Sequence, residues 1–172
     1  MLIQRSDIQT IAQVSNNLES SKLNPYILEA QELDLKPQLG AALYKALVDG
    51  IESSPQTAIY VTLMEGEAYT CGNDTIDFPG ITKALAYYAW ARYLSNQDGY
   101  STVWGVQQLT GGNSQGISEK SIARKIGQAR SAGAHYIEEM HRYLKEKLST
   151  YPLYKGDSGE RKRGKVNINS VG

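Results

Sequence analysis

The feature that most restricts the fold is a long helical pattern near the C-terminal end of the chain. From residue 122 to residue 148, apolar or small side chains recur at the spacing of one helix face. Ser118 lies where the N-cap of this helix is expected. A helix over residues 118–148 would be about 46 Å long at about 1.5 Å per residue. Because this exceeds the expected radius of a 172-residue domain, the helix needs neighbours at both ends, and these can be other subunits.

Two helices are expected near the start of the chain. Between Ser6 and Leu18 the apolar residues recur near a 3.6-residue period, which predicts a first helix. Asn24 followed by Pro25 is a good pair for the N-cap and first position of a second helix. The apolar residues of this second helix are Ile27, Leu28, Ala30 and Leu33.

A third helical run is expected to begin or kink at Pro37 and to end at Gly50. Its apolar stripe consists of Leu39, Ala42, Leu43, Ala46 and Leu47. Pro55 predicts the start of a fourth, short helix. Its inward-facing residues are expected to be Ile59, Leu63 and Met64.

The middle of the chain predicts a small β-hairpin followed by a buried helix. The runs EAYTC and DTIDF flank Gly72 and Asn73, a pair that suits a turn with positive φ. In residues 81–95 apolar side chains surround nearly the whole helix circumference. This distribution predicts the central buried helix of the domain.

A long glycine-rich segment separates this helix from the long C-terminal one. Residues 96–117 hold five glycines and a brief extended core from Thr102 to Leu109. A loop of this length inside a compact domain is usually functional or disordered.

The last residues, 155–172, predict an extended tail, because Pro152 stops the helix and glycines and charges follow. The basic residues of the tail are Arg161, Lys162, Arg163 and Lys165. Val166 and Ile168 alternate with polar residues, as in a strand that adds to the edge of another sheet. A disordered terminus is the alternative. The basic cluster fits a nucleic acid, an acidic protein or a solubilising role equally well.

Composition excludes several classes of protein. The 18 basic residues are balanced by 18 acidic ones, which argues against a protein dedicated to wrapping DNA. A single cysteine, Cys71, allows neither an internal disulfide nor a Cys-based zinc cluster. Twelve tyrosines against one phenylalanine are typical of surfaces buried against partners. Without a signal-like or membrane-spanning pattern, we expect a cytosolic product and no membrane partner.

The sequence TGGNSQGIS places Ser114 in the G-x-S-x-G order of many hydrolases, and Glu138 and His141 follow in the hydrolase chain order. The parallel sheet that such a serine needs is not predicted, so we expect no enzyme. The same stretch lacks the lysine of a phosphate-binding loop, since Ile117 stands in its place.

No metal or cofactor is expected either. Glu138 and His141 form one Glu-x-x-His pair, but a di-iron bundle needs two such pairs and two more glutamates. His135, His141 and the neighbouring glutamates are expected on a solvated or subunit-facing helix surface. No histidine or basic residue near Cys71 in the sequence would lower the pKa of its thiol, so we expect an inert cysteine.

Three blocks of sequence carry a family resemblance. They are YILEAQELDLKPQLGAALYKAL, FPGITKALAYYAWARYL, and SEKSIARKIGQARSAGAHYIEEMHRYLKEKLSTYPLY, and they cover most of residues 25–154. In this order, the chain resembles the head-tail connector, or neck adaptor, proteins of tailed bacteriophages, most closely the crAss-like version. The resemblance implies a mainly α-helical bundle with one long C-terminal helix, a small β-hairpin, a projecting loop and an extended tail. It implies a helical adaptor domain at residues 1–154 and a tail at 155–172.

Proteins of this family form rings, commonly of twelve copies, below the portal; they extend the DNA channel and dock the tail. The resemblance therefore implies a homo-oligomer in the virion neck, made in the host cytoplasm, with no catalytic residues. Its partners would be the portal protein, neighbouring neck and tail rings, and packaged DNA held without sequence specificity.

The same resemblance makes residues 97–117 the projecting segment, in which Trp104 would anchor a partner. The uncharged residues expected to line a path for DNA are Gln107, Gln108, Asn113, Ser114 and Gln115. A surface loop disordered in the free subunit is the alternative. We further expect the tail to wrap onto an adjacent subunit or ring, adding a strand through Val166 and Ile168. The rival functions are a DNA-associated protein that uses the basic tail, and a hydrolase that uses Ser114.

Overall fold

The computed structural model describes residues 1–12, 18–96, 100–102, 105–107 and 119–156. It is mainly helical, with a long helix near its end and small antiparallel hairpins, as the sequence predicts. Its helices are α1 (Arg5–Ile11), α2 (Ser20–Glu29), the π-helix η1 (Ala30–Leu35), α3 (Lys36–Leu39), α4 (Ala41–Glu52), α5 (Ala58–Glu65), α6 (Thr82–Ser95) and α7 (Glu119–Glu146). Its strands are β1 (Glu67–Cys71), β2 (Asp74–Phe78), β3 (Tyr100–Thr102) and β4 (Gly105–Gln107).

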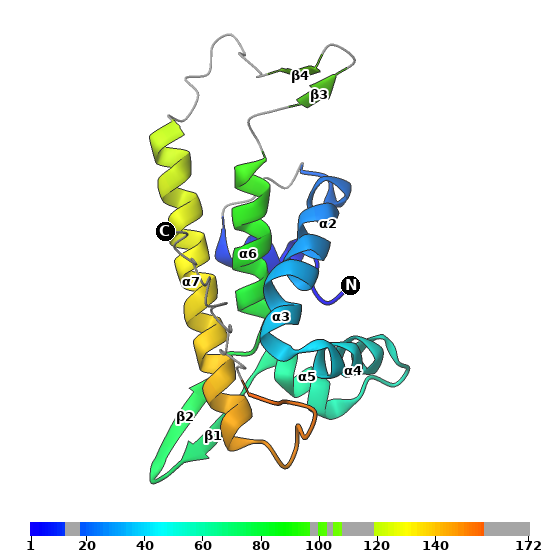
Figure 1. The fold of residues 1–172 in the computed structure, drawn as a ribbon, viewed down its shortest axis with the longest axis vertical. Coiled ribbons are helices and arrows are strands. Elements are labelled where there is room, and N and C mark those ends of the chain that lie inside the picture. The colour runs from blue at the N-terminus through cyan, green and yellow to red at the C-terminus, as the bar shows by residue number, and fades with distance from the viewer. Residues whose placement is uncertain (13–17, 97–99, 103–104, 108–118, 157–172) are drawn as a thin grey trace, which may run out of the picture.

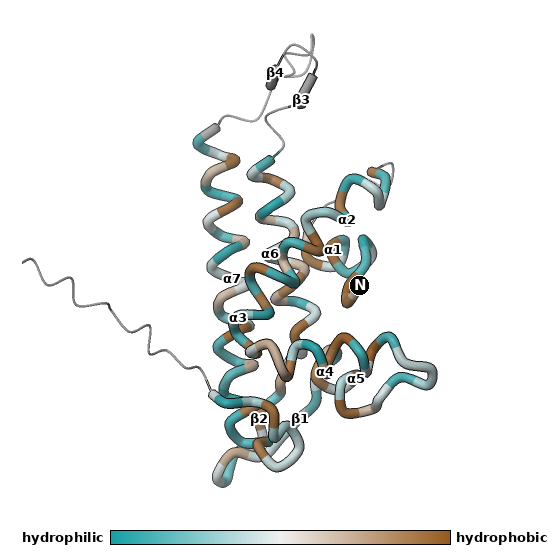
Figure 2. Tube along the Cα trace, turned by 45° about the vertical axis from the view of Figure 1, so that its right-hand side comes forward, coloured by the Kyte–Doolittle hydropathy of each residue, from teal (hydrophilic) through white to brown (hydrophobic). Residues whose placement is uncertain are grey.

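Helix α6 is the centre of the molecule. The long helix α7 packs on one side of α6, while α2 and η1 pack on the other (Figures 1 and 2). Helix α1 also packs on α6. The side chains of α6 that are fully buried are Ala84, Leu85, Ala86, Ala89 and Ala91. Four of these five are alanines, so neighbouring helices can approach α6 closely from several directions, and the prediction of a central helix is confirmed.

The hairpin of β1 and β2 projects at the end of the molecule where α4 and α5 also lie (Figure 1). Its register pairs Glu67 with Phe78 and Cys71 with Asp74, which leaves a two-residue turn. Gly72 in that turn has φ of +62°, a value that favours glycine. The predicted hairpin and its positive-φ turn are therefore confirmed.

The backbone at the end of α5 and the backbone between β2 and α6 cross in close contact at Gly66 and Gly80. Gly66 and Gly80 have φ of +96° and +77°, and each lies against the backbone beside the other. The amide of Ile81 donates to the carbonyl of Leu63 at 3.1 Å, and the hydroxyl of Thr82 donates to the carbonyl of Met64 at 2.7 Å. These bonds satisfy backbone groups that a close crossing would otherwise leave without partners.

Tyrosines fix the C-terminal end of α7 to the rest of the fold. The buried ring of Tyr143 stacks on Phe78, with ring centroids 4.2 Å apart, and its hydroxyl donates to Glu67 at 2.8 Å. The hydroxyl of Tyr151, beyond the helix end, donates to the carbonyl of Ile59 at 2.7 Å. The end of α7 is thereby tied to both β1 and α5.

The predicted start of the second helix is wrong. Helix α2 begins at Ser20 and carries Pro25 in its interior, instead of beginning at the Asn24–Pro25 pair. Leu23 and Ile27 lie one helical turn apart on either side of Pro25, and both are fully buried, so tertiary packing outweighs the preference of proline for a helix start. The helix then continues into the π-helix η1, which local sequence patterns do not signal.

Other boundaries also differ from the sequence predictions. Gly40, with φ of +77°, separates α3 from α4, and α4 continues past Gly50 to Glu52. Gly50 is retained inside the helix because the ring of Tyr60 lies where its Cβ would be. Leu63 and Met64 are buried as predicted, but Ala42 and Ile59 are exposed.

In the glycine-rich segment, the structure places a hairpin of β3 and β4 in which Thr102 pairs with Gly105. Within the extended core predicted from Thr102 to Leu109, Thr102 and residues 105–107 thus belong to two strands that pair antiparallel, while residues 103–104 and 108–109 lie outside the described part of the chain.

Two glycines on α7 allow a matched test of how that helix packs. A Cβ at Gly127 would meet no atom within 4 Å, whereas a Cβ at Gly133 would lie 3.1 Å from the ring of Tyr88. We expect Gly127→Ala to raise the free energy of unfolding by about 0.5–1 kcal/mol, because alanine is the better helix former. Gly133→Ala should gain less or lose stability, as Tyr88 must move. Urea unfolding of both variants checks this, and equal gains would contradict the close α6–α7 contact.

Candidate interaction surfaces

Most of the residues predicted to contact partners lie outside the described part of the chain. These are Trp104, Gln108, Asn113, Ser114, Gln115, Arg161, Lys162, Arg163, Lys165, Val166 and Ile168. Gln107 is the last residue of β4, where it pairs with Tyr100. The interaction residues treated below therefore come from the helical body.

The histidine considered as a hydrolase base or metal ligand is half-buried, and each of its ring nitrogens has a partner within the chain. Nδ1 of His141 lies 2.6 Å from the hydroxyl of Tyr154, and Nε2 lies 3.2 Å from Oε1 of Gln38. Glu139 pairs with Arg142 at 2.8 Å. His141 thus joins α7 to the segment after it and to α3, whereas His135 is exposed on α7. Across the ranges that the structure describes, no three His, Cys, Asp or Glu residues are arranged to hold a metal ion.

Cys71 is a poor nucleophile in this structure. The nearby carboxylate of Glu146 raises the pKa of the Cys71 thiol, with further increases from burial and from Asp74. A raised pKa leaves less of the reactive thiolate at neutral pH. The absence of activating neighbours predicted from the sequence agrees with this environment.

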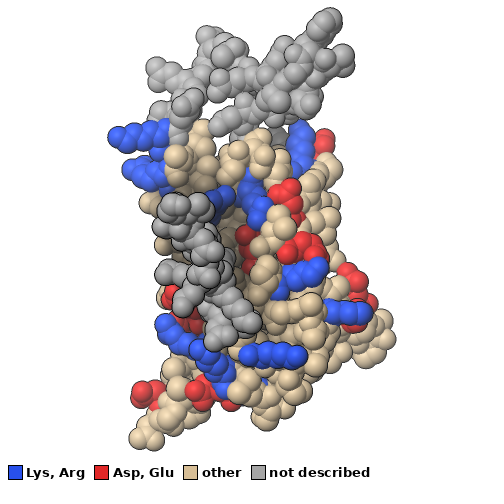
Figure 3. Space-filling view, in the orientation of Figure 1, with Lys and Arg blue, Asp and Glu red and all other residues tan. Residues whose placement is uncertain are grey.

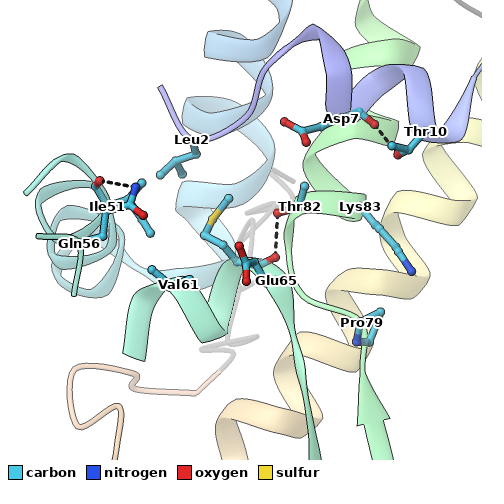
Figure 4. A pocket seen from close by; sticks show the side chains of 11 residues that line it. Leu2, Asp7, Thr10, Ile51, Gln56, Val61, Glu65, Pro79, Thr82 and Lys83 are labelled. Atoms are coloured by element: carbon cyan, nitrogen blue, oxygen red, sulfur yellow. Dashed lines mark hydrogen bonds between the residues drawn. The ribbon is translucent and has the colours of Figure 1, made fainter. Parts of the chain in front are cut away.

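An open hollow of 390 Å³ lies between α1, α4, α5 and the start of α6 (Figure 4). Several polar side chains at its wall already bond to backbone. Thr82 donates to the carbonyl of Met64 at 2.7 Å, Thr10 to that of Asp7 at 2.7 Å, and Gln56 to that of Ile51 at 3.0 Å. These three groups hold their own elements in place, and the charged side chains of Asp7, Glu65 and Lys83 also line the hollow.

A second depression has a different lining. This groove, of 520 Å³, lies where the end of α1 meets α6 and α7. Its walls are formed by Ile11, Ala12, Tyr87, Trp90, Lys125, Gln128, Ala129 and Ala132. The aromatic rings are supported from behind, since Tyr87 stacks on Tyr136 and Trp90 stacks on Tyr93. An apolar floor with one cation and one amide is typical of protein-binding surfaces.

On the other side of α6, a ridge of four exposed residues runs along α2 and η1. It consists of Leu28, Glu29, Glu32 and Leu33, and we call it the leucine ridge. Leu28 is 49% exposed and Leu33 is 60% exposed, although the sequence pattern grouped both with the apolar residues of a packed helix. The π-helix η1 sets the direction of Leu33, and π-helical turns are frequent at functional sites.

The ridge is held in place by ion pairs to its own side of the fold. Arg92 of α6 bonds both carboxylate oxygens of Asp34, at 2.7 and 3.0 Å, and also reaches Glu29 at 3.3 Å. A bidentate pair of this kind fixes orientation as well as distance. Lys36, and to a lesser extent Tyr44, lower the pKa of the Glu32 carboxyl. Glu29 pairs with Arg92 and Glu32 pairs with Lys36, so with Asp34 this region holds three carboxylates against two cations.

The first half of α7 is strongly basic. Residues 120–137 include four cations and no carboxylate. The cations are Lys120, Arg124, Lys125 and Arg130, all of which are exposed. Within the described residues none of them pairs with a carboxylate, in contrast to Arg92, Arg142 and Lys147. Figure 3 shows Lys and Arg side chains projecting at the upper left, where α7 lies.

Sequence reasoning did not identify the groove, the leucine ridge or the basic half of α7 as interaction surfaces. Of these three surfaces, only the basic half of α7 has a signal in the sequence, namely the four cations without a carboxylate in residues 120–137. The ridge and groove depend on how helices distant in sequence pack around α6.

The described residues form a mainly helical body that carries the groove, the leucine ridge and the basic first half of α7 on its surface. Residues 35–164 match the family described as Family of unknown function (DUF6712). The chain belongs to this family, since the match covers most of its length. No curated protein and no solved structure matches the chain. Among the described helices, none is long and apolar enough to cross a membrane.

The pairing of Glu67 with α7 predicts a pH dependence of stability. Bonds from Tyr143 and, secondarily, Lys147 lower the pKa of the Glu67 carboxyl from its ordinary 4.5. A lowered pKa adds stability that is fully present above pH 4.5 and is lost as the pH falls through the lowered value. We expect Glu67→Gln to be less stable than the unsubstituted chain at neutral pH, with the difference shrinking on acidification. Urea unfolding at several pH values tests this.

The matched control is Asp77→Asn on the neighbouring, exposed part of β2, which should show no such convergence. A Glu67→Gln difference that stays constant down to low pH would contradict the role of the charged pair.

Proposed function

We propose that this protein is a structural subunit of a phage neck, a head-tail connector that forms a ring below the portal. In this role it extends the DNA channel and presents a docking surface for the next tail component. Its partners are copies of itself, the portal and neighbouring neck or tail rings, with packaged DNA passing without sequence-specific contact. Its site of action is the virion, after synthesis in the host cytoplasm.

The observation that carries this proposal is that the three sequence blocks of the resemblance form one packed body. The first block supplies η1, α3 and much of α4, the second supplies α6, and the third supplies α7 and the turn after it. Asp34 of the first block bonds Arg92 of the second at 2.7 Å. Tyr87 of the second stacks on Tyr136 of the third, with centroids 5.8 Å apart.

The position of β3 and β4 also supports the proposal. The end of α6 and the start of α7 lie at the same end of the molecule, and the β3–β4 hairpin lies beyond both (Figure 1). A segment placed there extends from the helical body, as the connector role requires of residues 97–117. The basic first half of α7 lies next to this end.

The decisive experiment is to mix the purified chain with the portal complex of the same phage. Native mass measurement should show a ring of about twelve copies on the portal. Electron microscopy of the mature particle should place the chain at the vertex that joins capsid and tail. Absence from that vertex, together with no binding to the portal, would overturn the proposal.

A further inference from the structure

The leucine ridge and the groove are formed by different helices that pack around α6. Helices α2 and η1 cover one side of α6, while α7 covers the other, and both views show this order (Figures 1 and 2). The ridge is on the outer side of α2 and η1, and the groove opens beside α7. A ridge and a groove placed in this way cannot meet within one chain, but they can meet between two copies.

The two surfaces are complementary in their apolar parts. The ridge presents Leu28 and Leu33, which are 49% and 60% exposed. The groove presents the rings of Tyr87 and Trp90, with Ala129 beside them. Burying exposed leucines against supported aromatic rings removes apolar surface from water, which is the main driving force of association.

They are also complementary in charge. Glu29 and Glu32 lie between the two leucines of the ridge. At the wall of the groove lies Lys125, and the same half of α7 carries three further cations with no described carboxylate partner. Opposite charges at the edge of an apolar contact steer association and fix its register.

From these observations we propose that the leucine ridge of one copy binds in the α1–α6–α7 groove of the next copy. The contact is head-to-tail, because each copy uses two different surfaces. Heterologous contacts of this kind generate closed rings when the rotation between copies closes, and open filaments when it does not. This inference rests on the proposed connector function for the closed ring, but the contact itself is argued from the two surfaces alone.

The test uses one full-length variant for each surface. Leu28→Asp with Leu33→Asp places charge on the ridge, and Lys125→Glu with Gln128→Glu reverses the charge at the groove. All four substituted residues are exposed, so folding should be retained, and circular dichroism checks it. Each variant should weaken self-association by about 30-fold or more in sedimentation velocity.

Mixing the two variants gives the sharpest result. The ridge variant keeps an intact groove, and the groove variant keeps an intact ridge, so one good contact remains between them. We expect the mixture to form one-to-one dimers that grow no further, while each variant alone stays monomeric. A mixture that remains monomeric would overturn the proposal.

The matched controls change the same residue types elsewhere. Leu148→Asp with Leu153→Asp alters two other exposed leucines, 49% and 42% exposed, and Lys145→Glu alters another exposed lysine on α7. Both controls should associate like the unsubstituted chain. An unsubstituted chain that stays monomeric at the highest soluble concentration would count against the proposal, as would ridge and groove variants that assemble normally.

The same assays, with one added deletion variant, test two other occupants of the groove: the C-terminal tail and a nucleic acid. If deleting residues 157–172 abolishes assembly while the ridge variant assembles, the tail occupies the groove and the proposal is wrong. If the groove variant assembles but loses binding to a random-sequence DNA duplex in fluorescence anisotropy, the basic face is a nucleic-acid surface and the proposal is again wrong.

Failure of this contact is distinguishable from failure of the connector function. If a chain with both sets of substitutions still forms portal-bound rings, the connector function is supported and the ridge–groove contact is wrong. If the chain associates through the ridge and the groove but never binds a portal, the contact is supported and the connector function is wrong.

Discussion

Replacing Gly66 by alanine should reduce the free energy of unfolding by at least about 4 kcal/mol, an exceptional loss for one methyl group. A Cβ at this position would lie 2.1 Å from the carbonyl oxygen of Phe78 and 2.7 Å from the amide of Gly80. Both neighbours are backbone, so they can move only if the crossing of α5, the hairpin and α6 opens. The φ of +96° adds strain for any residue with a Cβ.

Gly72→Ala is the matched control for this prediction. Gly72 also has positive φ, at +62°, but its Cβ would meet nothing within 4 Å. We expect it to cost only about 1–2 kcal/mol, the penalty of the left-handed conformation alone. Thermal and urea unfolding of both variants separate the two effects. Equal losses would show that the close crossing of backbone contributes nothing beyond the backbone conformation.

Tyr143→Ala should cost about 3–5 kcal/mol, the range measured when large aromatic side chains are removed from cores. The Tyr143 ring is almost completely buried, stacked on Phe78 at 4.2 Å and edge-on to Tyr69 at 5.3 Å. Its loss would also leave Glu67 without the hydroxyl that bonds it at 2.8 Å. The end of α7 would then lose its main attachment to the hairpin.

Two further variants divide that loss into its parts. Tyr143→Phe keeps the ring and removes the hydroxyl, so it should cost about 1.5 kcal/mol, as expected for a bond to a charged group. Tyr26→Ala removes a half-buried tyrosine whose ring meets Tyr93 edge-on at 5.8 Å, and it should cost clearly less than Tyr143→Ala. If Tyr26→Ala proves as costly as Tyr143→Ala, the hairpin contact is not a principal anchor of α7.

The parts of the fold that the sequence predicts well are those with a strong local pattern. The period over residues 122–148 predicts α7, and the apolar circumference over residues 81–95 predicts α6. Gly72 and Asn73 between two short extended runs predict the β1–β2 hairpin. In each case the side-chain spacing or turn chemistry is contained within the element itself.

The errors occur where packing between distant segments decides the outcome. Pro25 lies inside α2 because Leu23 and Ile27 on both sides of it are buried. Leu33 is exposed because η1 departs from the regular helical period, so a stripe counted at 3.6 residues per turn misplaces it. A pattern confined to one helix contains no information about either effect.

The candidate site was harder to predict than the fold. Loop and tail residues were favoured because their composition is unusual, whereas the groove is formed by side chains from residues 11 to 132 that meet only after folding. The sequence alone does not identify Lys125 as a groove residue, because only the folded structure places Tyr87 and Trp90 beside it. Surfaces of this kind follow from tertiary structure, not from motifs.

The unequal support of α7 has a mechanical consequence. Its later half is fixed by buried Met140, Tyr143 and Leu144, while residues 120–128 have no buried side chain. The helix is therefore held from Ala129 to its C-terminal end, while its first turns extend beyond the last buried contact. A force applied near residue 120 acts through a lever arm of about 14 Å, at about 1.5 Å per residue, and its torque is borne first by the contact of Ala129 with the rest of the fold.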